Sequence, residues 1–241
     1  MGLFSLFGKK MDEPRERDPE PEKTPEQLAI EKENDQISRW GKSRRSSPQE
    51  KYRLLKELTE EGFGAAKYDL GLMYQNGEYV NEDWERAREL FMDCAEEIPW
   101  AAYALGIMGF HPNHYQVERD DQVGEGAYYL SQAAGRGLEA AFPEIQHWYH
   151  LFDGREVNPI ARLFDAELKD VFNELKEKAD EKSWDAMGLF YQNGVYVEQD
   201  LTKAKECFER SAALNPDDNF SSARRHLRNP IFDLLEEEED E

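Results

Sequence analysis

A block of 25 residues occurs twice in this chain, and the repetition constrains the fold more than any other feature. The first copy runs from Gly71 to Ala95 and the second from Gly188 to Ala212, at an offset of 117 residues and without a gap. About half of the aligned positions are identical. Similarity at a fixed offset is the sequence signature of a repeat protein, in which each unit packs on the next.

Two further units fit between these copies. An alanine stands four positions before an apolar residue at Ala66, Ala101 and Ala141, and that apolar residue directly precedes each anchor position. The anchors are separated by 35, 40 and 42 residues and lie at Gly71, Gly106, Gln146 and Gly188. Steps of this length are typical of repeats built from two helices.

Each unit is predicted to be a helix, a loop and a second helix. Small and apolar residues recur with helical spacing from Ala66 to Tyr74, and they predict close contact between helices of adjacent units. Gly77 and Gly194 are predicted to end the first helix, because glycine adopts the left-handed conformation readily. Asp83 and Asp200 are predicted N-caps of the second helix, since a carboxylate accepts hydrogen bonds from free backbone N–H groups.

These residues resemble the Sel-one-like repeat, a relative of the tetratricopeptide repeat. The family pattern is a Leu-Gly-x-x-Tyr-x-x-Gly core, a Val and an Asp in the loop, and a Lys-Ala helix that ends in small residues. Units one and four match it nearly throughout, unit two keeps Leu105-Gly106, and unit three keeps only Ile145 and Tyr149. The resemblance implies an all-α, right-handed α-solenoid of about four helix–loop–helix repeats with helical end caps.

Composition divides the chain into a flexible N-terminal segment (residues 1–47, with a short leader at 1–10), the solenoid (48–215), and a capping helix with a disordered acidic tail (216–241). Pro, Glu, Asp and Arg crowd the region before Glu26, although Thr24 can start a short helix that runs to Trp40. Ser47-Pro48 begins a predicted lone second helix that caps the stack. The closing helix is predicted to stop at Pro230.

The leader combines apolar residues with two lysines. Such a cluster can contact an anionic membrane surface weakly, or insert as a short motif into a groove of a partner. Gly2 suggests myristoylation, but the motif requires Ser or Thr where this chain has a leucine. A leader without function is the remaining interpretation. The residues predicted to make these contacts are Leu3, Phe4, Leu6, Phe7, Lys9 and Lys10.

The chain is strongly acidic, with 52 acidic and 30 basic residues and a formal net charge of −22. This charge argues against nucleic-acid binding, which requires cationic surfaces, and it favours a protein partner that is basic. Cys94 and Cys207 occupy different positions of their units, so no disulfide framework is implied. No apolar run is long enough to span a membrane, and we expect a cytoplasmic protein, with peripheral contact at the inner membrane face as an extension.

The sequence predicts neither a catalytic site nor a cofactor. No nucleophile elbow and no phosphate-binding glycine loop is present, so an enzyme, such as a hydrolase, is not expected. Units two and three depart from the packing pattern at aromatic and histidine residues, which can form an amphipathic binding patch. The four histidines among them also suggest a zinc site, although packing at the unit junction explains them better. The predicted partner-binding residues are Phe110, His111, His114, His147, Trp148, His150 and Trp184.

The expected function is therefore that of a bacterial scaffold or adaptor that binds a protein through its repeat surface, most plausibly through a concave face lined by the first helices. Two alternatives remain. One is an immunity or inhibitor protein whose acidic surface blocks a basic toxin or enzyme. The other is a membrane-peripheral organiser tethered by residues 1–10. The sequence leaves the partner and the oligomeric state open.

Overall fold

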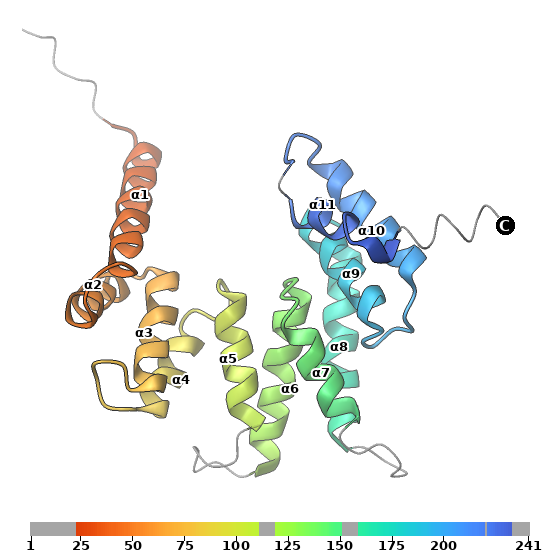
Figure 1. The fold of residues 1–241 in the computed structure, drawn as a ribbon, viewed down its shortest axis with the longest axis horizontal. Coiled ribbons are helices and arrows are strands. Elements are labelled where there is room, and N and C mark those ends of the chain that lie inside the picture. Colours follow the sequence, from red (N-terminus) through yellow and green to blue (C-terminus); the bar gives the residue numbers. More distant parts are fainter. Residues whose placement is uncertain (1–22, 111–118, 151–158, 220, 233–241) are drawn as a thin grey trace, which may run out of the picture.

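The computed structural model describes residues 23–110, 119–150, 159–219 and 221–232. Within these ranges the chain forms eleven α-helices and one short 3-10 helix, and no strand. Figure 1 shows the helices following one another along the molecule from α1 to α11. The bounds are α1 Pro25–Ser43, α2 Pro48–Glu60, α3 Gly64–Asn76, α4 Trp84–Met92, α5 Pro99–Phe110, α6 Arg119–Gly135, α7 Ala141–His150, α8 Pro159–Lys178, α9 Glu181–Asn193, α10 Leu201–Leu214 and α11 Ser222–Leu227, followed by the 3-10 helix Pro230–Phe232.

The four predicted units are the helix pairs α3/α4, α5/α6, α7/α8 and α9/α10. Units one and four show the loop chemistry expected from their sequences. Gly77 and Gly194 end α3 and α9 with φ values of 64° and 63°. Asp83 and Asp200 cap α4 and α10, and the side chain of each accepts a hydrogen bond of 2.9 Å from the backbone N–H three residues later. The all-α solenoid is confirmed.

The close contact at the conserved-looking glycines lies within a unit, not between units as the sequence suggested. Gly71 in α3 faces the ring of Phe91 in α4, and Gly188 in α9 faces the ring of Phe208 in α10 in the same way. Gly106 receives Leu130 of α6. The absence of a side chain lets a large residue of the second helix lie against the backbone of the first helix. Contact between adjacent units occurs instead at Gly135, which faces Val171 of α8.

The N-terminal end of the stack contains one helix more than the predicted cap. α2 is the expected capping helix, and α1 packs beside it and continues to Ser43, beyond the Trp40 at which the sequence placed its end. The indole Nε1 of Trp40 donates a hydrogen bond of 2.7 Å to Asp69 in α3. α1 and α2 therefore resemble a further helix pair at this end. The assignment of residues 1–47 to a flexible segment remains a prediction.

The C-terminal end is closed by α11, which lies within the predicted closing helix and packs against α10. The imidazole of His226 stacks on Phe208 with ring centroids 4.7 Å apart. Ser222 donates a hydrogen bond of 2.5 Å to the buried carboxylate of Asp185 in α9. Because these contacts join α11 to both helices of unit four, the last apolar surface of the stack is covered.

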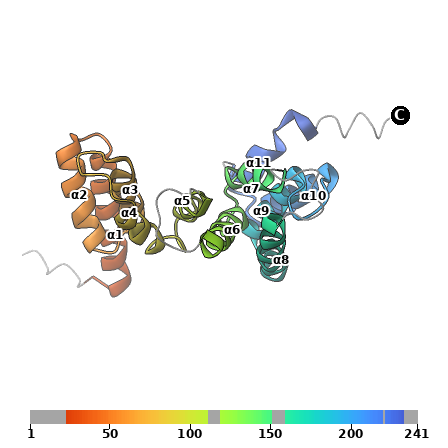
Figure 2. The same cartoon turned by 90° about the horizontal axis from the view of Figure 1, so that it is seen from below.

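The first helices of the central units share one side of the molecule. Figure 2 shows α5 and α7 on one side, with α6 and α8 on the other. The two ends of the stack extend past α5 on the side of the first helices, so that this side is hollowed at its centre (Figures 1 and 2). α5 and α7 form the floor of the hollow.

Candidate protein-binding surface

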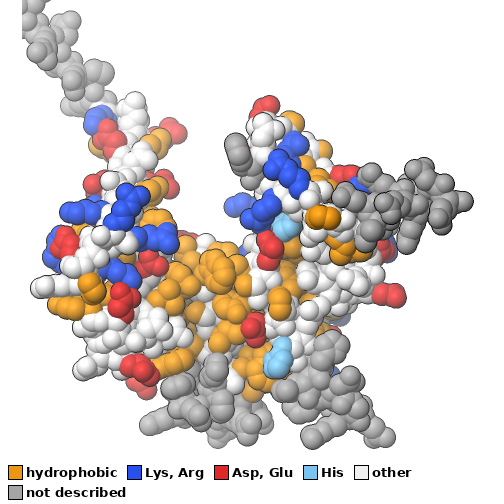
Figure 3. Space-filling view, in the orientation of Figure 1, with side chains coloured by type: hydrophobic (Ala, Val, Ile, Leu, Met, Phe, Trp, Pro, Cys, Tyr) orange, Lys and Arg blue, Asp and Glu red, His pale blue; other side chains and the backbone are white. Residues whose placement is uncertain are grey.

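α5 contains no charged residue, in a chain of which 34% of the residues are charged. One face of the helix is buried against α6, and Leu105 and Met108 belong to that face. The opposite face carries an apolar stripe with spacings of three, four and three residues, which defines one side of a helix. Figure 3 shows hydrophobic side chains gathered over α5 in the hollow. The residues of this α5 stripe are Trp100, Tyr103, Ile107 and Phe110.

A groove runs between the α5 stripe and α7. It has a volume of about 310 Å³ and is lined by Tyr103, Ile107, Phe110, Glu144 and Trp148. The ring of Trp148 stacks on Phe110 at a centroid distance of 4.2 Å and an interplanar angle of 19°. Phe110 lies in turn 5.8 Å from Phe164 of α8. The aromatic wall of the groove is thus held by three helices, which reduces the ordering cost of binding.

The edge of the groove carries one carboxylate. The hydroxyl of Tyr103 donates a long hydrogen bond of 3.4 Å to Glu144 Oε1. Burial raises the pKa of Tyr103, and the adjacent Glu144 carboxylate adds to the increase. Among the described residues no Lys, Arg or His forms an ion pair with Glu144. A half-buried carboxylate beside an apolar groove favours a ligand that brings a cation.

The structure brings some of the predicted binding residues together and separates others. Phe110 and Trp148 form the aromatic wall, and His147 is exposed beside Trp148 with ring centroids 5.4 Å apart. Trp184 lies elsewhere: it is half-buried in α9, under the guanidinium of Arg210 at 4.7 Å. That packing makes Trp184 part of unit four rather than of the groove.

Several predicted residues lie outside the described part of the chain. These are His111, His114 and the leader residues Leu3, Phe4, Leu6, Phe7, Lys9 and Lys10, together with the side chain of His150. Three of the four histidines of the zinc alternative are therefore not described. In the ranges that are described, no cluster of three or more metal-ligating side chains occurs.

The sequence missed three of the groove residues, namely Trp100, Tyr103 and Ile107. Their signal was the stripe itself, because a helix without charges and with apolar residues all round usually indicates a buried helix. Only the hollow shape of the stack leaves one face of α5 uncovered. Trp100 is the clearest case, since 47% of its surface is exposed.

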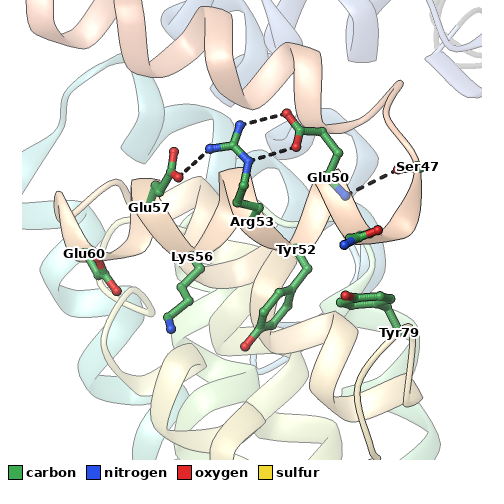
Figure 4. Close-up of a pocket in the computed structure, with 9 residues that line it drawn as sticks. Ser47, Glu50, Tyr52, Arg53, Lys56, Glu57, Glu60 and Tyr79 are labelled. Carbon is green, nitrogen blue, oxygen red and sulfur yellow. Dashed lines mark hydrogen bonds and ion pairs between the residues drawn. The ribbon is translucent and has the colours of Figure 1, made fainter.

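A larger groove, of about 640 Å³, lies at the N-terminal end of the stack on α2. Figure 4 shows Arg53 between Glu50 and Glu57, with Oε–Nη distances of 2.8 and 2.5 Å. Lys56 and Tyr52 project toward the side on which Tyr79 lies (Figure 4). The charges of this groove are largely paired within α2, so it offers less to a partner than the groove at α5.

Neither cysteine in the described residues has the properties of a nucleophile. Both thiols are buried and free. Burial raises the pKa of Cys94 to about 12 and that of Cys207 to about 11, so both remain protonated at neutral pH. No helix of the described residues is long and apolar enough to cross a membrane.

Comparison with known families agrees with the helix pairs. A family model described as the Sel1 repeat matches residues 64–91, 101–138 and 186–216, which correspond to units one, two and four. The chain carries three Sel1 repeats. Unit three, with α7 and α8, is the unit that the family model does not match. Sel1 repeats generally mediate protein–protein interactions, and the α5 stripe lies almost entirely in the second of them.

Two solved structures are similar to the chain over most of its length. A protective antigen of uropathogenic Escherichia coli with an SLR fold is 20% identical; the match covers 89% of this chain and 53% of the antigen, with a TM-score of 0.46. A Sel1 repeat protein from Oxalobacter formigenes is 19% identical; the match covers 88% of this chain and 91% of that protein, with a TM-score of 0.45. The chain spans about half of the antigen's length. No curated protein matches it.

Proposed function

We propose that this protein is a non-enzymatic scaffold that binds a protein partner in the groove between α5 and α7. The observation that carries the proposal is the α5 stripe, an uncharged helix face that stays accessible in a highly charged protein. Exposed apolar patches with a polar rim mark interaction sites on soluble proteins. The Sel1 repeats support the same class of function, because their shared positions are packing positions and leave the surface free to vary.

The groove favours a partner segment with apolar anchors. A helix or short peptide can present anchors one turn apart, which matches the spacing of the α5 stripe. Trp148 and Phe110 provide a rigid aromatic wall of the kind that dominates interfaces. Glu144 at the edge favours a basic residue next to the anchors, in agreement with the net charge of −22. The role is that of a cytoplasmic adaptor in a bacterium.

Replacing one exposed aromatic residue of the stripe tests the proposal. Trp100→Ala removes a side chain that is 47% exposed and should leave the melting temperature nearly unchanged. Tyr128→Ala in α6, at 43% exposure, is the matched control on a second helix. Proteins cross-linked to the native chain in its own lysate are quantified by mass spectrometry for each variant. We expect Trp100→Ala to deplete specific partners by about tenfold or more, which equals the loss of a strong contact.

The two variants give opposite results only if the stripe is the binding surface. Equal recovery of partners by wild type and Trp100→Ala would contradict the proposal. Loss of partners in Tyr128→Ala alone would move the surface to the second helices.

The inhibitor alternative has one supporting observation, which is the large negative charge. It requires a basic toxin or enzyme that forms a one-to-one complex and loses its activity there. An adaptor leaves the activity of its partner intact. Purifying the captured partner and assaying it with and without this protein separates the two.

A further inference from the structure

We propose that residues 3–10 of this chain occupy the groove between α5 and α7 of the same molecule. The inference rests on the proposed function, because it treats that groove as a binding surface. It adds a built-in competitor: a partner has to displace the chain's own leader before it reaches the α5 stripe.

The apolar part of the leader has the spacing that the groove requires. Leu3, Phe4, Leu6 and Phe7 fall on one side of a helical turn. The groove, at about 310 Å³, has the size of a small ligand pocket and fits one or two anchor side chains. Its wall consists of Phe110 and Trp148, against which an aromatic anchor can stack.

Charge distinguishes the leader from the other terminal segment outside the described residues. Residues 233–241 also contain two leucines, but they carry seven carboxylates and no cation. That segment would place like charges beside Glu144. The leader instead places Lys9 and Lys10 directly after its anchors, where either ammonium group can pair with the Glu144 carboxylate.

The connection between leader and helix α1 is long enough. Residues 11–22 separate Lys10 from Lys23, and twelve residues span up to roughly 40 Å when extended. Prolines and an excess of acidic residues in this connection favour extended conformations. α5 is the second first helix after α1, and packed helices lie about 8–10 Å apart, which gives a lateral separation of roughly 20 Å. The remaining length allows for displacement along the helices.

A short tether raises the occupancy of a weak contact. A flexible connection of this kind gives an effective concentration of about 1 mM. A leader that binds as a free peptide with a dissociation constant of roughly 0.1 mM would therefore be docked about ten times as often as it is released. A partner with several anchors can still displace it.

The test compares the full chain with a double variant, Phe4→Asp with Phe7→Asp. The indole N–H signals of the five tryptophans are recorded by NMR and assigned with Trp100→Phe and Trp148→Phe. We expect the double variant to shift the signals of Trp100 and Trp148, while those of Trp40, Trp84 and Trp184 stay in place. A synthetic peptide of residues 2–12, added to the double variant, should return both signals toward their wild-type positions, and a scrambled peptide should not.

Charge reversal provides the second arm. Glu144→Lys should weaken peptide binding by about tenfold or more, whereas Glu209→Lys, the same change on exposed α10, should leave it unchanged. Equal weakening by both variants would reduce the effect to net charge and overturn the pairing with Glu144.

Three other outcomes would overturn the proposal. Identical indole signals in wild type and double variant mean that the leader is not in the groove. A leader-dependent shift that disappears on dilution means that a second copy supplies it. Binding of the wild type, but not the double variant, to phosphatidylglycerol vesicles without any indole difference assigns the leader to membranes. The proposed function fails separately, by unchanged partner recovery in Trp100→Ala, so either idea can fall alone.

Discussion

The ring of Phe91 lies against the backbone of Gly71, and a Cβ added to Gly71 would come within 2.5 Å of Phe91 Cε1. The equivalent pair, Gly188 and Phe208, repeats this arrangement 117 residues later. Both rings are completely buried. The glycines are therefore required by the packing of the two helices of one unit, and their cost to helix propensity is offset by that contact.

Gly71→Val and Gly188→Val should each lower the free energy of unfolding by roughly 1–3 kcal/mol, because the added side chain overpacks the contact with the phenylalanine ring. Urea denaturation measures the change. Gly124→Ala in α6 is the control: nothing lies within 4 Å of its added Cβ, so better helix propensity should stabilise by about 0.5–1 kcal/mol. Equal midpoints for wild type and both valine variants would contradict the assigned contact.

Ala179 and Gly62 occupy equivalent positions after the second helix of their units, and both have positive φ, at 46° and 88°. A left-handed backbone costs an alanine about 1–2 kcal/mol, which glycine avoids. Ala179→Gly should therefore raise the free energy of unfolding by up to about 1 kcal/mol, after the greater freedom of glycine in the unfolded chain is counted. Gly62→Ala should lower it. Changes of the same sign in both variants would exclude this explanation.

The hydrogen bond from Trp40 to Asp69 joins α1 to the first unit. Trp40→Phe should cost about 1 kcal/mol, because the donor is lost and the partly buried carboxylate keeps no substitute for it. Hydrogen exchange should accelerate in α1 by several-fold and stay unchanged in α9. Asp69→Asn keeps an acceptor and should have a smaller effect. If α1 exchanges as in the wild type after Trp40→Phe, its position does not depend on this bond.

Asp185 should make stability depend on pH in the opposite direction from a typical carboxylate. Burial raises its pKa above the ordinary value of 3.8, while Ser222, His226 and Arg225 oppose the increase and Glu139 adds to it. A carboxyl group with a raised pKa in the folded state is favoured there when protonated. Its contribution to stability is full below about pH 3.8 and is lost as pH rises through the raised value.

Asp185→Asn keeps an acceptor for Ser222 and removes the titration. Relative to wild type, it should gain stability as pH rises from about 4 to 7 in urea denaturation. Asp180→Asn should behave in the reverse manner, since hydrogen bonds from Ser183 lower the pKa of Asp180 and stabilise its charged form. A difference between Asp185→Asn and wild type that is constant over this range would contradict the assignment.

Local signals in the sequence were sufficient to predict the units. Asn-Gly at the end of α3, an aspartate before α4 and their copies in unit four act within a few residues, and each is present in the structure. The helix α1 was expected, but its packing through Trp40 was not, because the partner Asp69 lies 29 residues away. Such contacts depend on how helices are stacked, which no local pattern records.

The candidate surface was predicted only in part, for a related reason. Phe110 and Trp148 stood out because they depart from the repeat pattern, whereas Trp100 and Ile107 fit an ordinary buried helix. Whether an apolar face of α5 is covered depends on the curvature of the stack, which arises from all units together. Trp184 was assigned to the patch by composition alone, and the rotation of α9 places it against Arg210 instead.

The uncharged floor formed by α5 also separates two kinds of partner by their response to salt. Contacts between apolar surfaces are not screened by ions, whereas attraction to an exterior with a net charge of −22 weakens strongly between low and physiological ionic strength. A protein held by the α5 stripe should stay bound when the salt concentration is raised. A basic protein held only by the acidic exterior should be released, so a salt gradient on the immobilised chain sorts its ligands by the surface that they use.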